Sequence, residues 1–429
     1  MDILTNPPRE QWPMLTRRAL ADEKGRVSEI VADIMARVRT EGDKAIIDLE
    51  HRFTGADLQE LRVSETELDE AEANVPQKLK EAMALAARNI ESFHKAQIHK
   101  AVEVETAPGV SCWQRSVPID RVGLYIPGGN SPLFSTVLML AVPARIAGCG
   151  ETVLCTPADK NGRISPAILY AAKTAGVHAV YKTGGAQAIA AMTFGTDTIP
   201  RVHKIFGPGN RYVTEAKQQA STCGVAIDMP AGPSEVMVIA DGNADPSFVA
   251  ADFLSQAEHG ADSQSILLTT DSRLADLVPQ EIDRMLTDLP HAALASQSLL
   301  HSRIIVCPDN ETMMDFANLY APEHLIINHS QASELAEHVR NAGSVFIGPY
   351  STESAGDYAS GTNHTLPTSG YASAYSGVNT DSFTKKITFQ HLTAKGVRSI
   401  GRAVEVMAEA EGLYAHKLAM TLRLQKVNN

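Results

Sequence analysis

Near the N-terminus, apolar residues recur at spacings of three and four, which is the period of an amphipathic helix. The pattern runs through residues 17–98 and is clearest in VSEIVADIMARVRTEGDKAIIDLEHRF and PQKLKEAMALAARNIESFHKAQ. It predicts a helical region in which each helix buries one face against a core.

From Val122 the pattern changes to short apolar runs that alternate with helical segments. The runs VGLYIP, ETVLCTP and HKIFGPG are separated by segments such as STVLMLAVPARIAG, and a second series extends from EVMVIA to SVFIG. Buried strands separated by helices are typical of parallel sheets with helices on both faces. We therefore predict an α/β protein with two Rossmann-like, doubly wound parallel-sheet domains and helical N- and C-terminal extensions.

Residues 349–381 break this alternation. YSTESAGDYASGTNHTLPTSGYASAYSG is rich in Ser, Gly and Thr and has little apolar periodicity. Such a composition suits a flexible linker, but a long irregular stretch inside a compact protein is more often functional. Because the stretch holds Asp357 and His364, we interpret it as a binding loop.

Charge and cysteine content narrow the class of protein. The net charge of −12 argues against nucleic acid or an anionic membrane as the main partner. No apolar run approaches the roughly 20 residues needed to span a bilayer, and the N-terminal residues lack the apolar centre of a signal peptide. We expect a soluble cytoplasmic protein with reduced, buried cysteines, because the five are scattered without a CxxC pair: Cys112, Cys149, Cys155, Cys223 and Cys307.

A doubly wound sheet suggests a nucleotide ligand, yet the GxGxxG fingerprint is absent. The nearest candidate, GPGNRY at 207–212, lacks the third glycine. Three glycine turns nevertheless follow predicted strands, at 127–129, 184–185 and 207–209. Helix N-termini just after such turns offer free backbone amides to phosphate. The alternative is that they are tight turns without a ligand.

The predicted helix 247–259 carries a candidate ligand set. Gln256 and His259 are three residues apart and share one helix face, with Asp252 a turn earlier on the same side. A histidine on a helix is also commonly structural, so the pattern alone leaves both readings open. HExxH is absent, which excludes the common zinc-hydrolase helix.

Adjacent Glu323 and His324 lie in a predicted turn before the strand HLIINH. A carboxylate beside an imidazole suits two separate proton transfers, although a solvent-facing pair at a helix end has the same sequence. Asp357, Glu411 and His416 are further candidates or ordinary surface residues. Pooled, one Gln, one Asp and two His make an N/O site compatible with zinc, provided that they meet in space.

Longer strings give a more specific signal. Over essentially the whole chain, eight strings resemble the signature stretches of the histidinol dehydrogenase family. In order, they are VGLYIPGG, GGAQAIAA, KIFGPGN, AIDMPAGPSEV, SQAEHG, APEHL, SAGDYASGTNH and AHK. The resemblance implies an NAD-dependent oxidoreductase of the last steps of histidine biosynthesis. The implied reaction is a zinc-dependent four-electron oxidation of L-histidinol to L-histidine through bound L-histidinaldehyde, using two NAD.

The resemblance also implies roles for individual residues. One zinc ion per subunit would be held by Gln256, His259, Asp357 and His416. Glu323 and His324 would be catalytic. Substrate would be contacted by these six residues and by Ser234, His364 and Glu411. NAD would be contacted by Tyr125, Gln187 and Asn210.

Members of the family are homodimers in which C-terminal segments cross to the neighbour, so Glu411 and His416 would complete the partner's site. The implied division is an N-terminal extension (1–21), a larger α/β domain carrying metal and catalytic residues (22–124 plus 235–380), a second Rossmann-like domain contacting NAD (125–234) and a helical C-terminal tail exchanged across the dimer (381–429).

Two alternatives follow from the same motifs. A paralogous zinc- and NAD-dependent dehydrogenase would act on another polar primary alcohol, but it would be expected to change the groups that recognise imidazole and amine. Ser234, His364 and Glu411 are retained. A non-catalytic nucleotide- or metal-binding subunit would be favoured by loss of Glu323, His324 or a zinc ligand, and none is lost.

Overall fold

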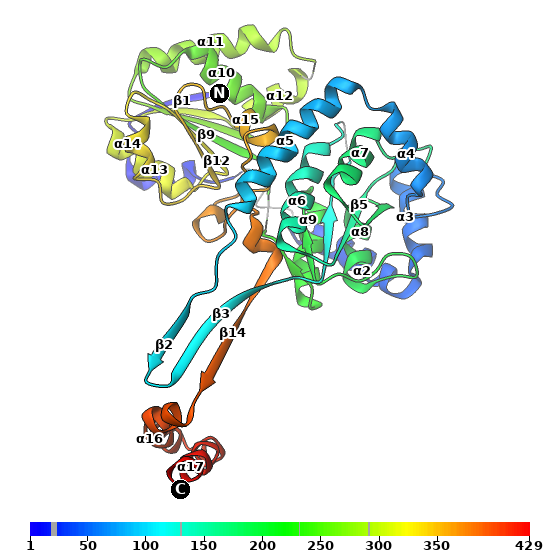
Figure 1. The fold of residues 1–429 in the computed structure, drawn as a ribbon. Helices are drawn as coiled ribbons and strands as arrows, with labels where there is room; N and C mark the ends of the chain where they lie inside the picture. Colours follow the sequence, from blue (N-terminus) through cyan, green and yellow to red (C-terminus); the bar gives the residue numbers. More distant parts are fainter. Residues whose placement is uncertain (19–23, 129–130, 231, 291) are drawn as a thin grey trace.

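A computed structural model describes residues 1–18, 24–128, 131–230, 232–290 and 292–429. It has two α/β lobes, each built on a parallel sheet, and a slender arm that ends in a helical hairpin (Figure 1). The five-stranded sheet has the order β6-β5-β4-β7-β8. Its strands are β4 (Arg121–Tyr125), β5 (Glu151–Thr156), β6 (Ala179–Lys182), β7 (Lys204–Phe206) and β8 (Ala226–Ile227). Its helices are α6 (Phe134–Ala147), α7 (Pro166–Ala175), α8 (Gly185–Phe194) and α9 (Arg211–Thr222).

The strand order reverses between β4 and β7, which is where doubly wound sheets bind ligands. Gly207 follows β7 at this point with φ +127°. A Cβ on Gly207 would collide with the backbone carbonyl oxygen of Tyr125 at the end of β4. Only glycine permits both this backbone conformation and this close approach.

The six-stranded sheet has the order β1-β11-β10-β9-β12-β13, with every pair parallel. Val236 and Val238 of β9 pack into one apolar core and Met237 and Ile239 into another, so both faces are covered. Its strands are β1 (Asp2–Thr5), β9 (Glu235–Ala240), β10 (Gln264–Thr269), β11 (Arg303–Val306), β12 (His324–Asn328) and β13 (Ser344–Ile347). The helices are η1 (Arg9–Gln11), α1 (Trp12–Leu15), α10 (Pro246–Ala257), α11 (Ser272–Leu286), α12 (Ala292–Leu299), α13 (Asn310–Tyr320), α14 (Ala332–Ala336) and α15 (Glu353–Tyr358).

The N-terminal helices belong to the lobe of the five-stranded sheet, where they pack on the helices that flank it. Val31, Ile46 and Ile90 belong to the same apolar core as Val122 and Ile205. This packing differs from the expected division, which grouped residues 22–124 with the six-stranded sheet. The apolar face of a helix shows that it is packed but not which sheet it covers. The four helices are α2 (Lys24–Glu41), α3 (Asp43–Thr54), α4 (Glu65–Asn74) and α5 (Gln77–Lys95).

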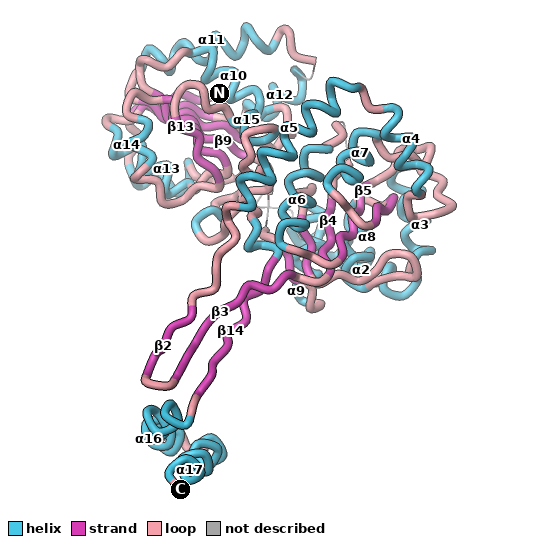
Figure 2. The backbone as a smooth tube through the Cα atoms, in the orientation of Figure 1, coloured by secondary structure: helices cyan, strands magenta, loops and turns pink. Residues whose placement is uncertain are grey.

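The arm is an antiparallel three-stranded sheet of order β14-β3-β2 that leads to two helices (Figure 2). The expectation of a wholly helical C-terminal tail is wrong at β14. This strand carries few apolar residues, and much of it is exposed, so its period-two signal is weak. Phe389 stacks on Trp113 of β3 with ring centroids 5.4 Å apart. The elements are β2 (Glu103–Ala107), β3 (Val110–Pro118), η2 (Tyr371–Ser373), η3 (Thr380–Phe383), β14 (Thr384–Leu392), α16 (Ala394–Ala410) and α17 (Tyr414–Asn428).

The predicted fold class of two doubly wound parallel sheets is confirmed. At the N-terminus the structure adds a strand, since β1 pairs with β11 as an edge of the six-stranded sheet. In the described parts of the chain, no helix is both long and apolar enough to cross a bilayer. All five cysteines are free thiols, but Cys223 is exposed and Cys112 half-buried, so the expected burial holds only for the other three.

Candidate active site

The candidate site lies at the amino ends of two neighbouring strands of the six-stranded sheet. His324 is the first residue of β12 and pairs in register with Val236 of β9. Glu323 directly precedes it, as the predicted turn requires. Ligands of doubly wound sheets usually lie at the carboxyl ends of the strands, so the structure places this pair at the less common edge.

Two further elements bring polar side chains to the same edge. Helix α10 begins at Pro246, where Asp245 accepts a hydrogen bond from the amide of Ser247. It ends at Ala257, so His259 lies just beyond the helix rather than on it. After β13 the chain forms α15, which carries Glu353 and Asp357. We use "amino-edge cluster" for Gln256, His259, Glu323, His324, Glu353 and Asp357.

Glu323 is buried. One carboxylate oxygen, Oε2, accepts a hydrogen bond of 2.9 Å from the backbone amide of Glu235 and lies 3.7 Å from Nδ1 of His324. Burial penalises the charged form and raises the pKa of Glu323 to about 8. A carboxyl group with a pKa near neutrality suits transfer of a proton at physiological pH.

Carboxylates surround the buried ring of His324. Its Nδ1 lies 3.7 Å from Oε1 of Glu353 and its Nε2 lies 3.7 Å from Oδ1 of Asp357. Burial alone would lower the pKa of the ring, but the negative charges of Glu353 and Glu323 outweigh it and raise the pKa to about 10. Nε2 has no hydrogen-bond partner among the described residues, and therefore remains available to a ligand.

The other half of the amino-edge cluster has the chemistry of a cation site. Ligand atoms of His259, Glu353 and Asp357 lie within 4.8 Å of one another. Among the described residues, both oxygens of Glu353 and both amide atoms of Gln256 are buried without a hydrogen-bond partner. Buried carboxylates without donors are costly unless a cation compensates them. These imidazole and carboxylate groups fit a divalent metal such as zinc.

Glu353 was not among the residues predicted from the sequence. It lies four residues before Asp357, so the two share one face of α15. The spacing is visible in ESAGDY, but the Ser-, Gly- and Thr-rich composition around it predicts a loop, in which such a spacing has no meaning. Asp252 lies beside this group, where its Oδ1 accepts a 3.1 Å hydrogen bond from Thr352, and burial raises its pKa to about 6.

His364 connects the two lobes at this edge. Its Nδ1 lies 2.9 Å from the backbone oxygen of Asp357, and its Nε2 lies 3.0 Å from Oγ1 of Thr136 on α6. Ser234 immediately precedes β9 and is half-buried. The structure thus brings His364 to the amino-edge cluster and also to the lobe with the glycine turns.

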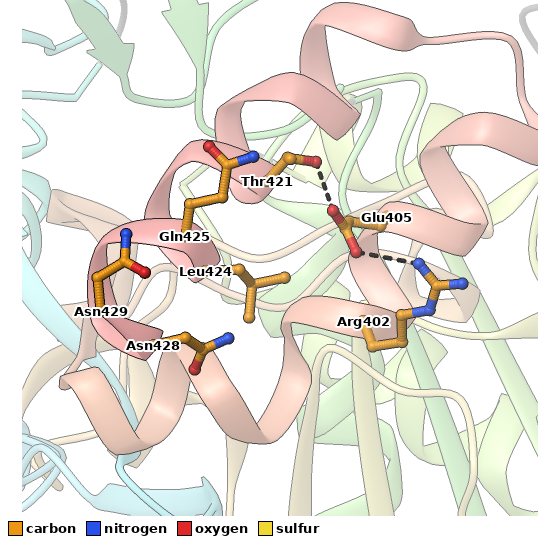
Figure 3. A pocket seen from close by; sticks show the side chains of 7 residues that line it. All are labelled: Arg402, Glu405, Thr421, Leu424, Gln425, Asn428 and Asn429. Atoms are coloured by element: carbon orange, nitrogen blue, oxygen red, sulfur yellow. Dashed lines mark hydrogen bonds and ion pairs between the residues drawn. The ribbon is translucent and has the colours of Figure 1, made fainter.

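Glu411 caps the end of α16 and His416 lies on α17, and both residues are exposed. These two helices lie at the far end of the arm, remote from the lobe that carries the amino-edge cluster of the same chain (Figure 1). A hollow between α16 and α17 is also there (Figure 3). Its carboxylate, Glu405, accepts hydrogen bonds from Thr421 and Arg402, both of which also line the hollow. The hairpin also exposes large apolar side chains, namely Val406, Met407, Leu413, Tyr414, Leu418 and Leu422.

The expected NAD residues lie near the glycine turns of the five-stranded sheet. The hydroxyl of Tyr125 accepts a 3.1 Å hydrogen bond from the amide of Gly185, and Asn210 caps α9. Gln187 is buried and donates to Oε1 of Glu50 at 2.9 Å. The same oxygen accepts from the amide of Gly184, which sequence reasoning did not anticipate. Gly129 of the first turn is outside the described residues.

Comparisons with known proteins agree on one family. A family model described as histidinol dehydrogenase matches residues 16–424. A relative named histidinol dehydrogenase from Bacteroides fragilis (strain YCH46) is 55% identical over 427 residues, 100% of each chain. One from Yersinia pestis is 52% identical over 422 residues, 98% of this chain and 94% of the relative. The crystal structure of histidinol dehydrogenase from Elizabethkingia anophelis has a TM-score of 0.98 at 53% identity, covering 100% of this chain and 99% of that one.

Proposed function

This chain belongs to the histidinol dehydrogenase family, and from that premise we propose that the amino-edge cluster is its active site, where L-histidinol is oxidised to L-histidine with NAD. The observation that carries the proposal is the buried Glu323–His324 pair beside the His259, Glu353 and Asp357 group. A divalent cation at this group would lower the pKa of both side chains, and in that state the pair can accept two protons at different stages of one reaction.

The proposed metal is zinc, with Gln256, His259 and Asp357 as ligands from one chain. His416 of the partner subunit would complete the set. When bound, zinc would supply a positively charged template for the amine and imidazole nitrogens of histidinol. The unpartnered amide of Gln256 and the excess of buried carboxylates support this assignment.

The two catalytic side chains would act at different steps. His324 would accept the proton of the substrate hydroxyl as the alcohol is oxidised. Glu323 would then take a proton from a water that adds to the bound aldehyde, while His324 returns its proton to the carbonyl oxygen and so forms the hydrate. The neutral His324 would then accept a hydroxyl proton of this hydrate as the second hydride leaves. NAD would supply the hydride acceptor for each of the two oxidations, and the protein positions the reacting groups. Two oxidations at one carbon explain why two proton acceptors lie side by side.

The proposed NAD contacts are Tyr125, Gln187 and Asn210. The proposed further substrate contacts are Ser234, His364 and Glu411. The hydrogen bond between His364 and Thr136 supports this arrangement, because His364 also contacts Asp357 and so links the amino-edge cluster to the first turn of α6. Backbone amides at the start of a helix favour phosphate groups.

We propose a homodimer in which the arm carries Glu411 and His416 to the partner's site. Their distance from the amino-edge cluster of their own chain and the apolar surface of the α16–α17 hairpin support it. The test is to mix a His416→Ala protein with a Glu323→Gln protein after dissociation. Restored turnover is expected, because one site of the mixed dimer would then hold only native residues. Inactive mixed dimers would contradict shared sites.

The catalytic assignment is tested with two variants and two substrates. His324→Asn should lose oxidation of both histidinol and histidinaldehyde, since the imidazole serves both steps. Glu323→Gln should mainly slow the aldehyde step, where water must be activated. A Glu323→Gln enzyme that oxidises pre-formed aldehyde at the wild-type rate would contradict the role given to Glu323.

A further inference from the structure

We propose that Arg18, in the N-terminal segment, is a positioning residue that holds Glu323 and His324 in their reactive arrangement. This rests on the proposed function, because it presupposes that Glu323 and His324 are the catalytic pair. Arg18 does not enter the amino-edge cluster; it acts through Glu235 and through the end of α13.

Arg18 is bound on several sides at once. Its Nε and Nη2 donate to the two carboxylate oxygens of Glu235 at 2.7 and 3.0 Å, which is the bidentate arrangement that only arginine provides. Nη2 also donates to the backbone oxygen of Tyr320 at 2.6 Å, and Nη1 to that of Thr16 at 3.0 Å. The guanidinium carbon lies 3.7 Å from the centre of the Tyr320 ring. The side chain of Glu235 is 1% exposed and that of Arg18 19%, so this pair is shielded from water.

Glu235 is also the backbone neighbour of both catalytic groups. Its amide donates to Oε2 of Glu323 at 2.9 Å, and its carbonyl oxygen lies 3.4 Å from Nδ1 of His324. Glu235 therefore binds Arg18 through its side chain and orients Glu323 and His324 through its main chain. A rotation of Glu235 that followed the loss of Arg18 would move both contacts together.

Arg18 also holds the chain just before Glu323, through its hydrogen bond to the carbonyl oxygen of Tyr320. Tyr320 is the last residue of α13, and Ala321 after it has φ +51°, a left-handed conformation that is unfavourable for alanine. Only Ala321 and Pro322 separate this point from Glu323. By holding the carbonyl of Tyr320, Arg18 fixes the turn that carries the catalytic pair. Arg18 thus spans the start of β9 and the turn before β12.

A purely structural role would have different consequences from a positioning role. If Arg18 only fastened the N-terminal segment to the lobe, any other tie between them would serve equally well. Arg9 offers that comparison, because its Nη2 contacts Oδ2 of Asp315 on α13 at 2.6 Å. That pair is exposed and does not touch Glu235 or Tyr320. Arg9→Met is therefore the matched control for Arg18→Met.

The experiment measures kcat and KM for histidinol and histidinaldehyde, together with Tm and bound zinc. We expect Arg18→Met to lose roughly ten- to a hundredfold in kcat with both substrates, because displacement of reacting groups by about 1 Å has effects of that size. The zinc content should stay within about twofold of wild type, since no proposed metal ligand contacts Arg18 or Glu235. KM for histidinol should change less than kcat, because the proposed metal ligands that also contact the substrate are untouched. Arg9→Met should keep the wild-type kcat.

Arg18→Met also removes the cation paired with the buried carboxylate of Glu235, which would keep the hydroxyl of Tyr320 as a donor at 3.0 Å but no opposite charge, and this alone can unfold the protein. The double variant Arg18→Met/Glu235→Gln removes that charge and should regain Tm. Its kcat should nevertheless stay low, because neither the carbonyl of Tyr320 nor the side chain at position 235 regains the guanidinium that held it. Recovery of kcat together with Tm would overturn the proposal.

Glu323→Gln and His324→Asn are assayed in parallel, so that two kinds of failure are distinguished. If these two variants lose activity while Arg18→Met keeps the wild-type kcat, the positioning role alone is refuted. If Glu323→Gln and His324→Asn both keep wild-type rates, the proposed catalytic pair is refuted, and the positioning role of Arg18 is refuted with it.

Discussion

The buried carboxyl of Glu323 should make the stability of the metal-free protein depend on pH. Its pKa in the folded protein is raised to about 8 from an ordinary value of 4.5, with burial as the main cause. The folded protein therefore holds this proton more tightly than the unfolded chain does. Its contribution to stability is complete below pH 4.5 and is lost as the pH rises toward 8.

The size of this effect follows from the shift. Each pH unit between the two pKa values costs about 1.4 kcal/mol of folding free energy, so the change from pH 5 to pH 7 costs about 2.7 kcal/mol. The side chain of Glu323 is 7% exposed, so solvent screening reduces this little. Glu323→Gln keeps the shape of the protonated carboxyl but cannot ionise, so the variant should escape this loss.

The assay is thermal unfolding of chelator-treated wild type and Glu323→Gln at several pH values from 5 to 7. We expect similar Tm values at pH 5 and a Tm advantage for the variant that grows toward pH 7. The charge of Glu323 also raises the pKa of His324, so the comparison is repeated in a His324→Asn background, where only position 323 differs. Glu337→Gln, at an exposed position of the same lobe, should follow wild type at every pH. Parallel curves for wild type and Glu323→Gln would refute the desolvation of this carboxyl.

Three further predictions concern the metal, a buried ion pair and a glycine turn. Glu353→Gln should weaken zinc binding about ten- to a hundredfold in a chelator competition, because its carboxylate lies beside the proposed ligands; unchanged affinity would exclude Glu353 from the metal environment. Asp228→Asn should lose about 3–5 kcal/mol of stability by denaturant unfolding, because it removes the negative charge that is paired with the buried ammonium group of Lys217. A loss below 1 kcal/mol would contradict a stabilising role of this ion pair. Gly207→Ala should lower Tm and raise the Kd for NAD in a fluorescence titration, since the added methyl collides with the carbonyl of Tyr125; wild-type values would contradict the close approach.

The sequence was sufficient for the strand–helix alternation and therefore for the fold class, because apolar runs and their spacing report burial directly. It was insufficient for β14, where Ile387 and Phe389 alternate on an exposed arm without a continuous core behind them. It also could not decide which sheet the helices of residues 24–95 cover, because that depends on contacts far apart along the chain.

The same distinction holds for the site. Adjacency indicates Glu323 and His324, and a spacing of three indicates Gln256 and His259, although His259 lies just beyond α10. Local patterns reveal residues that are close along the chain. Glu353 was missed because it becomes part of the site only when α15 folds against the start of β12. Likewise, no local signal connects Arg18 with Glu235, more than two hundred positions away.

The central claim, that a metal-dependent site carries histidinol through two successive oxidations, is tested most directly by one stoichiometry. Purified protein is incubated with histidinol and NAD, and NADH is counted against histidine formed, before chelation, after it and after zinc is restored. We expect two NADH per histidine, none from the chelated protein and two again with zinc. One NADH per histidinol with release of free aldehyde, or full turnover without metal, would contradict it.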